Sequence, residues 1–106
     1  MPKFLLEVRY TVDGLKGVVA KGGTARVEAA TAGVESAGGK VEAFYFAFGE
    51  NDVYVVADMP DNAAAAAVAL AVGSAGGAKV KTVPLLTPDE VDRATKANVE
   101  YRPPGA

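Results

Sequence analysis

Hydrophobic and polar positions change their spacing several times along the chain, and each change predicts a new element. Residues 3–11 alternate with the period of two that a β-strand requires. The apolar positions of this segment are Phe4, Leu6, Val8 and Tyr10. From residue 12 to about residue 37 the apolar positions recur at steps of three and four, which predicts a helix. Gly22 and Gly23 interrupt that pattern, so we expect a kink or two helical pieces.

Residues 41–59 predict two strands joined by a tight turn at residues 49–52. Apolar side chains occupy nearly every position of this hairpin, so both of its faces need cover. Alternation divides the side chains into two sets on each strand. The sets are Val41, Ala43, Tyr45 and Ala47 against Phe44, Phe46 and Phe48, and then Val53, Val55 and Ala57 against Tyr54 and Val56. One set meets the helices and the other forms an apolar patch. The expected interface residues are Phe44, Phe46, Phe48 and Val56.

The second half of the chain carries clear helix starts and stops. Pro60 and Asp61 end a strand and cap a helix over residues 62–75 that has almost no polar side chains. A strand follows over residues 78–86, and because proline cannot donate to a ladder, Pro84 predicts that this strand lies at a sheet edge or ends near that residue. Residues 87–90 are a helix-start signature for a short helix to about residue 97.

The element order is strand, helix, strand, strand, helix, strand and a helical tail. This order predicts an α+β, ferredoxin-like βαββαβ fold with a C-terminal helix, in which an antiparallel sheet carries two helices on one face. We expect one domain over residues 1–97 and a tail over residues 98–106. A second copy would cover the bare face most simply, so the expected partner is the protein itself, as a homodimer or a higher even oligomer.

Composition removes several function classes. The chain has 106 residues, 11 basic and 13 acidic, and its formal charge of -2 lacks the positive field that nucleic-acid binding requires. It contains neither Cys nor His, which excludes a disulfide framework, a thiol nucleophile, a His-based triad and a zinc site of the usual ligands. We therefore expect no metal and no cofactor.

The termini and apolar runs point away from a membrane. The chain enters a strand at once and lacks the pattern of a signal peptide, so a cytoplasmic location is expected by default. The longest apolar run, residues 63–72, is about half of the roughly 20 residues that a membrane span needs.

Several motifs resemble the GYD domain family, over residues 3–97. These motifs are Tyr10-Thr11-x-x-Gly14-x-Lys16-Gly17, Gly23 and Arg26, the run from Phe44 to Val53, Pro60-Asp61 before an alanine-rich helix, and Leu85-Leu86-Thr87-Pro88. The resemblance implies a ferredoxin-like fold of the dimeric α/β-barrel kind and no established activity. The signature glycine, tyrosine and aspartate of the family would sit at Gly49, Asn51 and Asp52. Because position 51 is Asn, no role of that tyrosine carries over.

Three groups of residues are candidates for a small-molecule site. Tyr10, Lys16 and Arg26 could hold an anion, or the two cations could be solvated or paired on the surface. Glu50 and Asp52 could transfer protons, but their place in a hairpin turn makes a backbone-capping role the stronger interpretation. The third group is Glu7, Arg9, Tyr54 and Asp58, which could line a pocket between sheets or form an ion pair beside an interface. Tyr45 and Tyr54, with charged groups, could also line a pocket between the helices and the sheet.

Three classes of function follow. The first is a small-molecule-binding or assembly module without catalysis, which we favour because no activated residue pair stands out. The second is a cofactor-independent oxygenase or isomerase with a pocket between sheet and helices, which rests on analogy of fold. The third is an accessory subunit of a larger complex.

Overall fold

The computed structural model describes residues 1–105. Its seven elements follow the order β-α-β-β-α-β-α. They are β1 (Lys3–Tyr10), α1 (Val12–Ser36), β2 (Lys40–Phe46), β3 (Val53–Asp58), α2 (Asn62–Ser74), β4 (Ala78–Leu85) and α3 (Pro88–Lys96). The order confirms the prediction of an α+β, ferredoxin-like arrangement.

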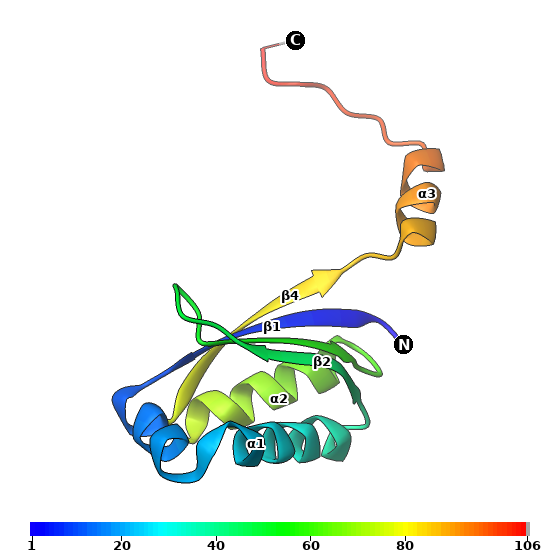
Figure 1. The fold of residues 1–106 in the computed structure, drawn as a ribbon. Coiled ribbons are helices and arrows are strands. Elements are labelled where there is room, and N and C mark those ends of the chain that lie inside the picture. Colours follow the sequence, from blue (N-terminus) through cyan, green and yellow to red (C-terminus); the bar gives the residue numbers. More distant parts are fainter. Residues whose placement is uncertain (106) are drawn as a thin grey trace.

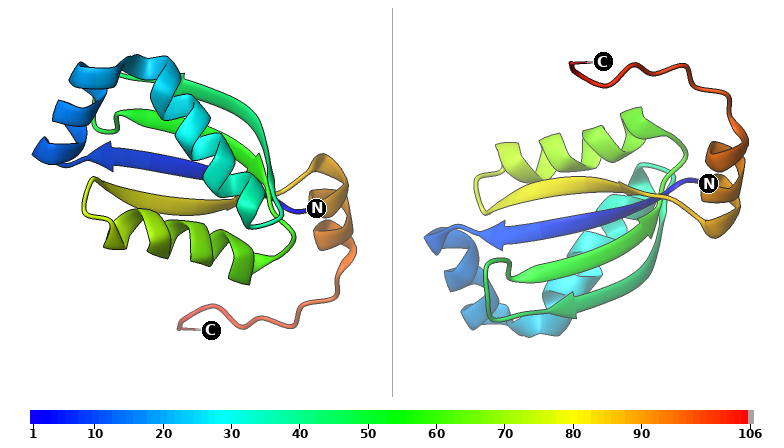
Figure 2. Two further views of the ribbon diagram at one scale, coloured as in Figure 1. Left: turned by 90° about the horizontal axis from the view of Figure 1, so that it is seen from below. Right: turned by 90° about the horizontal axis from the view of Figure 1, so that it is seen from above.

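The four strands form one antiparallel sheet in the order β2-β3-β1-β4. Helices α1 and α2 lie on one face of this sheet, below it in Figure 1, and leave the other face uncovered. Figure 2 shows both helices in front of the strands in one view and behind them in the opposite view. β4 is an edge strand, as Pro84 predicts.

The core lies between the helices and the two central strands. Fully buried side chains come from alternate positions of β1 and β3, which point toward α1 and α2. They are Phe4, Leu6, Val53, Val55, Ala57 and Met59, together with Val34 of α1 and Ala65 of α2. Since α2 contributes mainly alanines, it lies close to the sheet and buries little volume per residue.

Local signals in the sequence fix the helix ends. The Thr11 side chain caps α1 by accepting a hydrogen bond from the backbone N–H of Gly14, and Asp61 caps α2 in the same way through Ala64. Within α1, Gly22 has φ of 83°, a left-handed conformation that favours glycine. The predicted kink is therefore confirmed at Gly22.

The hairpin differs from the predicted alternation at one point. A register shift between Val41 and Ala43 moves Val41 to the helix side, opposite Ala57, where Phe44 and Phe46 also lie. The predicted set that joins Val41 with Ala43 and Tyr45 is therefore wrong. β2 ends at Phe46, so the connection covers residues 47–52 and is longer than the predicted four-residue turn.

The last helix and the tail project from the body. In Figure 1, α3 lies beyond the end of β4, and the tail continues upward, on the side of the sheet that α1 and α2 leave uncovered. The radius of gyration is 16.8 Å, against about 13 Å for a compact chain of this length. Among residues 1–105, none of the helices combines the length and apolar character needed to cross a bilayer.

Candidate functional site

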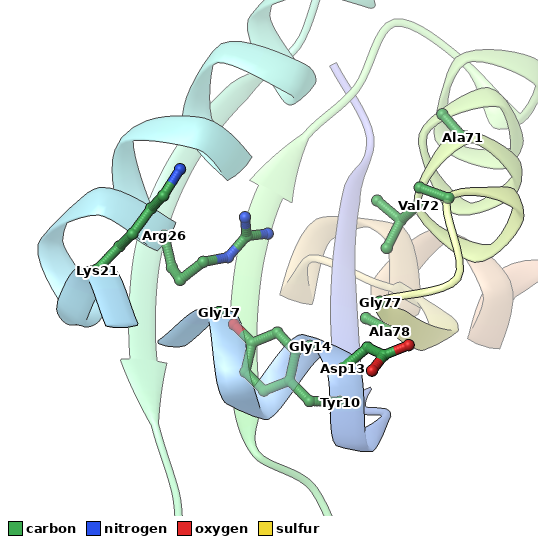
Figure 3. Close-up of a pocket in the computed structure, with 11 residues that line it drawn as sticks. Tyr10, Asp13, Gly14, Gly17, Lys21, Arg26, Ala71, Val72, Gly77 and Ala78 are labelled. Atoms are coloured by element: carbon green, nitrogen blue, oxygen red, sulfur yellow. The ribbon is translucent and has the colours of Figure 1, made fainter. Parts of the chain in front are cut away.

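A cavity of about 490 Å³ opens where β1 ends and α1 begins (Figure 3). The walls come from β1, both parts of the kinked α1, the end of α2 and the start of β4. The residues that line it are Tyr10, Asp13, Gly14, Gly17, Lys21, Arg26, Ala71, Val72, Ala75, Gly77 and Ala78. Most are glycine or small apolar residues, which leaves space beside a few polar side chains.

The base of the cavity is held by contacts between the start of α1 and the segment before β4. Thr11 donates its backbone N–H to the carbonyl of Gly77 at 3.0 Å and its hydroxyl to the carbonyl of Gly76 at 2.9 Å. A Cβ atom at Gly14 would collide with the carbonyl of Gly77. Glycine at position 14 is therefore required for this close approach.

The kink at Gly22 determines where the two cations of the cavity lie. It changes the direction of α1 between Lys21 and Arg26, and both residues reach the cavity lining. In Figure 3 the guanidinium of Arg26 extends toward the space above the Tyr10 ring. Arg26 is half-buried. Both ion pairs among residues 1–105 belong to Lys3, so Arg26 has no carboxylate partner within this part of the chain.

A second, smaller cavity of about 130 Å³ lies between the helices and the sheet. Its lining is apolar apart from Tyr10 and Arg26, which also line the larger cavity. Val72 and Ala78 are shared as well. Tyr10 and Arg26 therefore stand at the junction of an open polar cavity and an inner apolar one.

The structure brings together two of the three residues predicted to hold an anion. Tyr10 and Arg26 share the cavity, whereas Lys16 is exposed on α1 and lies outside the lining. The lining instead contains Lys21 and Asp13, which the sequence analysis did not select. The sequence feature that could have identified Lys21 is its position directly before Gly22, where α1 kinks.

Asp52 has a defined structural contact. Its Oδ2 accepts a hydrogen bond from the backbone N–H of Tyr10 at 2.8 Å, and its own N–H donates to the carbonyl of Val8 at 2.8 Å. The connection between β2 and β3 is thus tied to the end of β1. The backbone carbonyl of Glu50 accepts from Arg9 at 3.0 Å. These contacts favour the turn interpretation of Glu50 and Asp52.

Tyr45 and Tyr54 lie on the uncovered face of the sheet, away from both cavities. They are cross-strand partners of β2 and β3, with exposed fractions of 72% and 36%. By alternation the same face carries Leu5, Ala43, Val56, Val83 and Leu85. We call this surface the open face.

The four predicted interface residues are divided by the fold. Val56 belongs to the open face. Phe44 packs against the core, and the ring of Phe46 lies against Gly23 of α1. Phe48 is fully exposed in the connection between β2 and β3. Their participation in an interface stays a prediction.

Charged side chains of both signs lie at each end of the open face. At the start of β1, Lys3 donates to Asp58 and to Glu42, both at 2.9 Å. These hydrogen bonds, first with Asp58 and then with Glu42, raise the pKa of Lys3. At the other end of β1, Arg9 lies opposite Lys79 without an ion-pair partner among residues 1–105.

The cavity chemistry suits recognition of an anion. An arginine offers a planar fork of N–H donors that matches a carboxylate or phosphate, and Lys21 adds a second positive charge. Among residues 1–105, no group of three or more acidic side chains lies where it could hold a metal ion.

Comparison with known proteins places the chain in a family. A search of functionally described proteins and a search of solved structures found no match. The profile of the GYD domain matches residues 4–95, which include every strand except the first residue of β1 and nearly all of α3. Over this range the match contains the junction of the two cavities and the turn that holds Asp52. The chain therefore belongs to the GYD domain family.

Proposed function

We propose that this protein binds a small amphipathic anion in the joined cavities. The charged group of the ligand contacts Arg26 and Lys21, and its apolar part enters the inner cavity between helices and sheet. The observation that carries this proposal is the guanidinium of Arg26, half-buried at the junction without a carboxylate partner. A charged donor in such a place gains most from a ligand that supplies the missing acceptor.

The same lining favours binding over catalysis. The enzyme hypothesis drew on Tyr45 and Tyr54 as pocket residues, and both belong to the open face. The cavity itself offers one phenol, two cations and the carboxylate of Asp13. This set can orient an anion, but it contains no pair of a nucleophile with a general base in contact.

Titration with hexanoate, a short-chain carboxylate, tests this proposal. We expect it to shift the backbone NMR signals of Tyr10, Arg26 and Ala78 in the full chain. Arg26→Gln removes the charge-assisted hydrogen bonds, each of which contributes about 1.5–3 kcal/mol. The dissociation constant should therefore rise about 10- to 100-fold.

Two controls make the result specific. Lys16→Gln changes a cation of the same helix outside the cavity and should leave the affinity unchanged. Hexanol, which has the same chain without the charge, should bind more weakly than hexanoate. Equal affinity of the Arg26→Gln variant and the unaltered chain, or no signal shifts at the cavity, would contradict the proposal.

We further propose that the protein pairs with a second copy through the open face. The face carries exposed or half-buried apolar side chains from all four strands, including Leu5, Val56 and Val83. A second copy turned end to end places the end that holds Lys3, Glu42 and Asp58, where the charges largely cancel, against the positive Arg9 and Lys79 end, so like charges do not meet. Such an isologous pair is a closed assembly.

A further inference from the structure

Residues 86–105, which we call the C-terminal arm, leave the body without packing against it. None of the strands or other helices among residues 1–105 packs along α3. Four large apolar side chains of the arm are exposed, namely Leu86, Val91, Val99 and Tyr101. The longest extent of the molecule, 57 Å, reflects this projection.

An unsupported α3 would be a weak helix. It has nine residues, and isolated helices shorter than about 12–15 residues are marginal in water. Its Thr87–Glu90 capping box strengthens only the first turn. A helix of this length normally owes its stability to packing of an apolar side, which here would be the side of Val91 and Ala94.

The connection to β4 directs the arm away from its own sheet. Only Leu86 and Thr87 separate β4 from α3, and Thr87 is extended, with φ of -76° and ψ of 159°. Pro88 follows and disfavours a helical conformation at Thr87. The extended Thr87 carries α3 on past the end of β4 (Figure 1). The arm also rises on the open-face side, where a second copy would lie (Figure 1).

The open face contains an unmet charge that suits the arm. Arg9 and Lys79 are directly opposite each other on β1 and β4, and with Lys81 they outnumber Glu7, the acidic side chain beside them on the same face. This end of the open face therefore keeps an excess of positive charge, which a counter-charge would stabilise. The first two turns of α3 carry Asp89, Glu90 and Asp92. This acidic segment follows the end of β4, whereas Arg9 and Lys79 lie at its start. In an end-to-end pair, the acidic segment of one copy approaches the two cations of the other.

We propose that the arm of each copy docks on a second copy, with Val91 against its apolar surface and the acidic half of α3 beside its Arg9 and Lys79. This inference rests on the proposed pairing through the open face and adds a reciprocal exchange of arms to it. The arm then acts as a clamp that links two copies. The exchange covers its apolar residues and neutralises the cation pair.

Single cysteines test the exchange, because the chain has none of its own. Thr95→Cys and Lys81→Cys variants of the full chain, which keep Arg9, Lys79 and the three acidic residues of α3, are prepared separately, mixed, and treated with a short bis-maleimide. We expect a covalent heterodimer between the two variants. Glu35→Cys replaces Lys81→Cys in the matched control, since Glu35 is exposed near the end of α1, and at least tenfold less heterodimer should form.

Sedimentation velocity of the unaltered chain separates the possible failures. A dimer whose mixed variants give no more cross-link than the control overturns the exchange and leaves the pairing intact. A monomer at micromolar concentration overturns both. A cross-link that forms only within one chain, in the Thr95→Cys/Lys81→Cys double variant, shows that the arm folds onto its own subunit and also overturns the exchange.

Discussion

Asp52 shows how one side chain can connect three segments that are distant in sequence. Its carboxylate accepts from Tyr10 at the end of β1, directly before the cap of α1, while its backbone holds Val8 and Ala47. Tyr10 lines both cavities, so this contact holds the backbone of a residue that lines them. Asp52 is thus a structural support at the edge of the cavity.

Replacement of Asp52 by Ala should lower the free energy of unfolding by about 1.5–3 kcal/mol, the usual loss for a hydrogen bond to a charged group. Asp52→Asn keeps an acceptor oxygen and should lose less. Urea unfolding followed by circular dichroism measures both changes. Glu50→Ala is the matched control, because only the backbone carbonyl of Glu50 makes a hydrogen bond, and its effect should stay below about 0.5 kcal/mol. An Asp52→Ala protein of full stability that no longer binds hexanoate would point to a ligand contact instead.

The candidate site was partly predictable at the residue scale. Tyr10 and Arg26 could be selected because a phenol at a strand end and a cation on the next helix converge in this fold. Lys16 and Lys21 are both lysines of that helix, and a straight helix gives no reason to choose between them. The direction that α1 takes after Gly22 determines that Lys21, and not Lys16, lines the cavity. A sequence pattern can predict that a helix kinks, but it does not predict the angle of the kink.

At the scale of elements, strong local signals predicted most of the fold. The capping residues Asp61 and Thr87, the kink at Gly22 and the edge position of β4 are all confirmed. The hairpin was less predictable, since alternation assumes an unbroken register. One extra residue near Glu42 reverses the faces on either side of it, and this bulge leaves no clear mark in the composition.

Helix α3 should lose its first turn as the pH falls. In the folded helix, hydrogen bonds from the backbone N–H of Thr87, and then with its side chain, lower the pKa of Glu90 from its ordinary value of 4.5. The unfolded chain therefore binds the proton more readily, and the stabilisation is present above about pH 4.5 and lost as the pH falls through the lowered value. Carbon-13 NMR shifts of residues 88–96 between pH 6 and pH 3 would follow this loss.

The Glu90→Gln variant provides the comparison for that titration. Glutamine keeps an acceptor for Thr87 but has no carboxyl group to protonate, so the change at the start of α3 should shrink. Asp89 and Asp92 remain in both proteins and give the same background. An identical pH profile in the two proteins would assign the change to those aspartates.

The whole molecule combines a closed core with two unfinished surfaces. One side of the sheet is sealed by α1 and α2, while the open face and the C-terminal arm both lie on the other side (Figure 1). A single copy leaves apolar side chains exposed on both surfaces. One two-fold partner could cover both surfaces at once. We therefore treat the open face and the arm as parts of one interface.

Val56→Asp tests that interface at its centre. Val56 lies on β3 within the open face, so in a single copy an aspartate there stays in contact with water and the fold should survive. In the proposed pair the carboxylate would be buried without a partner, which should raise the dissociation constant of the dimer at least about 100-fold, measured by sedimentation equilibrium. Val19→Asp, on α1 with 87% of its surface exposed, should leave assembly unchanged. If Val56→Asp dimerises as tightly as the unaltered chain, the two copies meet through another surface, and the apolar side chains of the open face need a different partner.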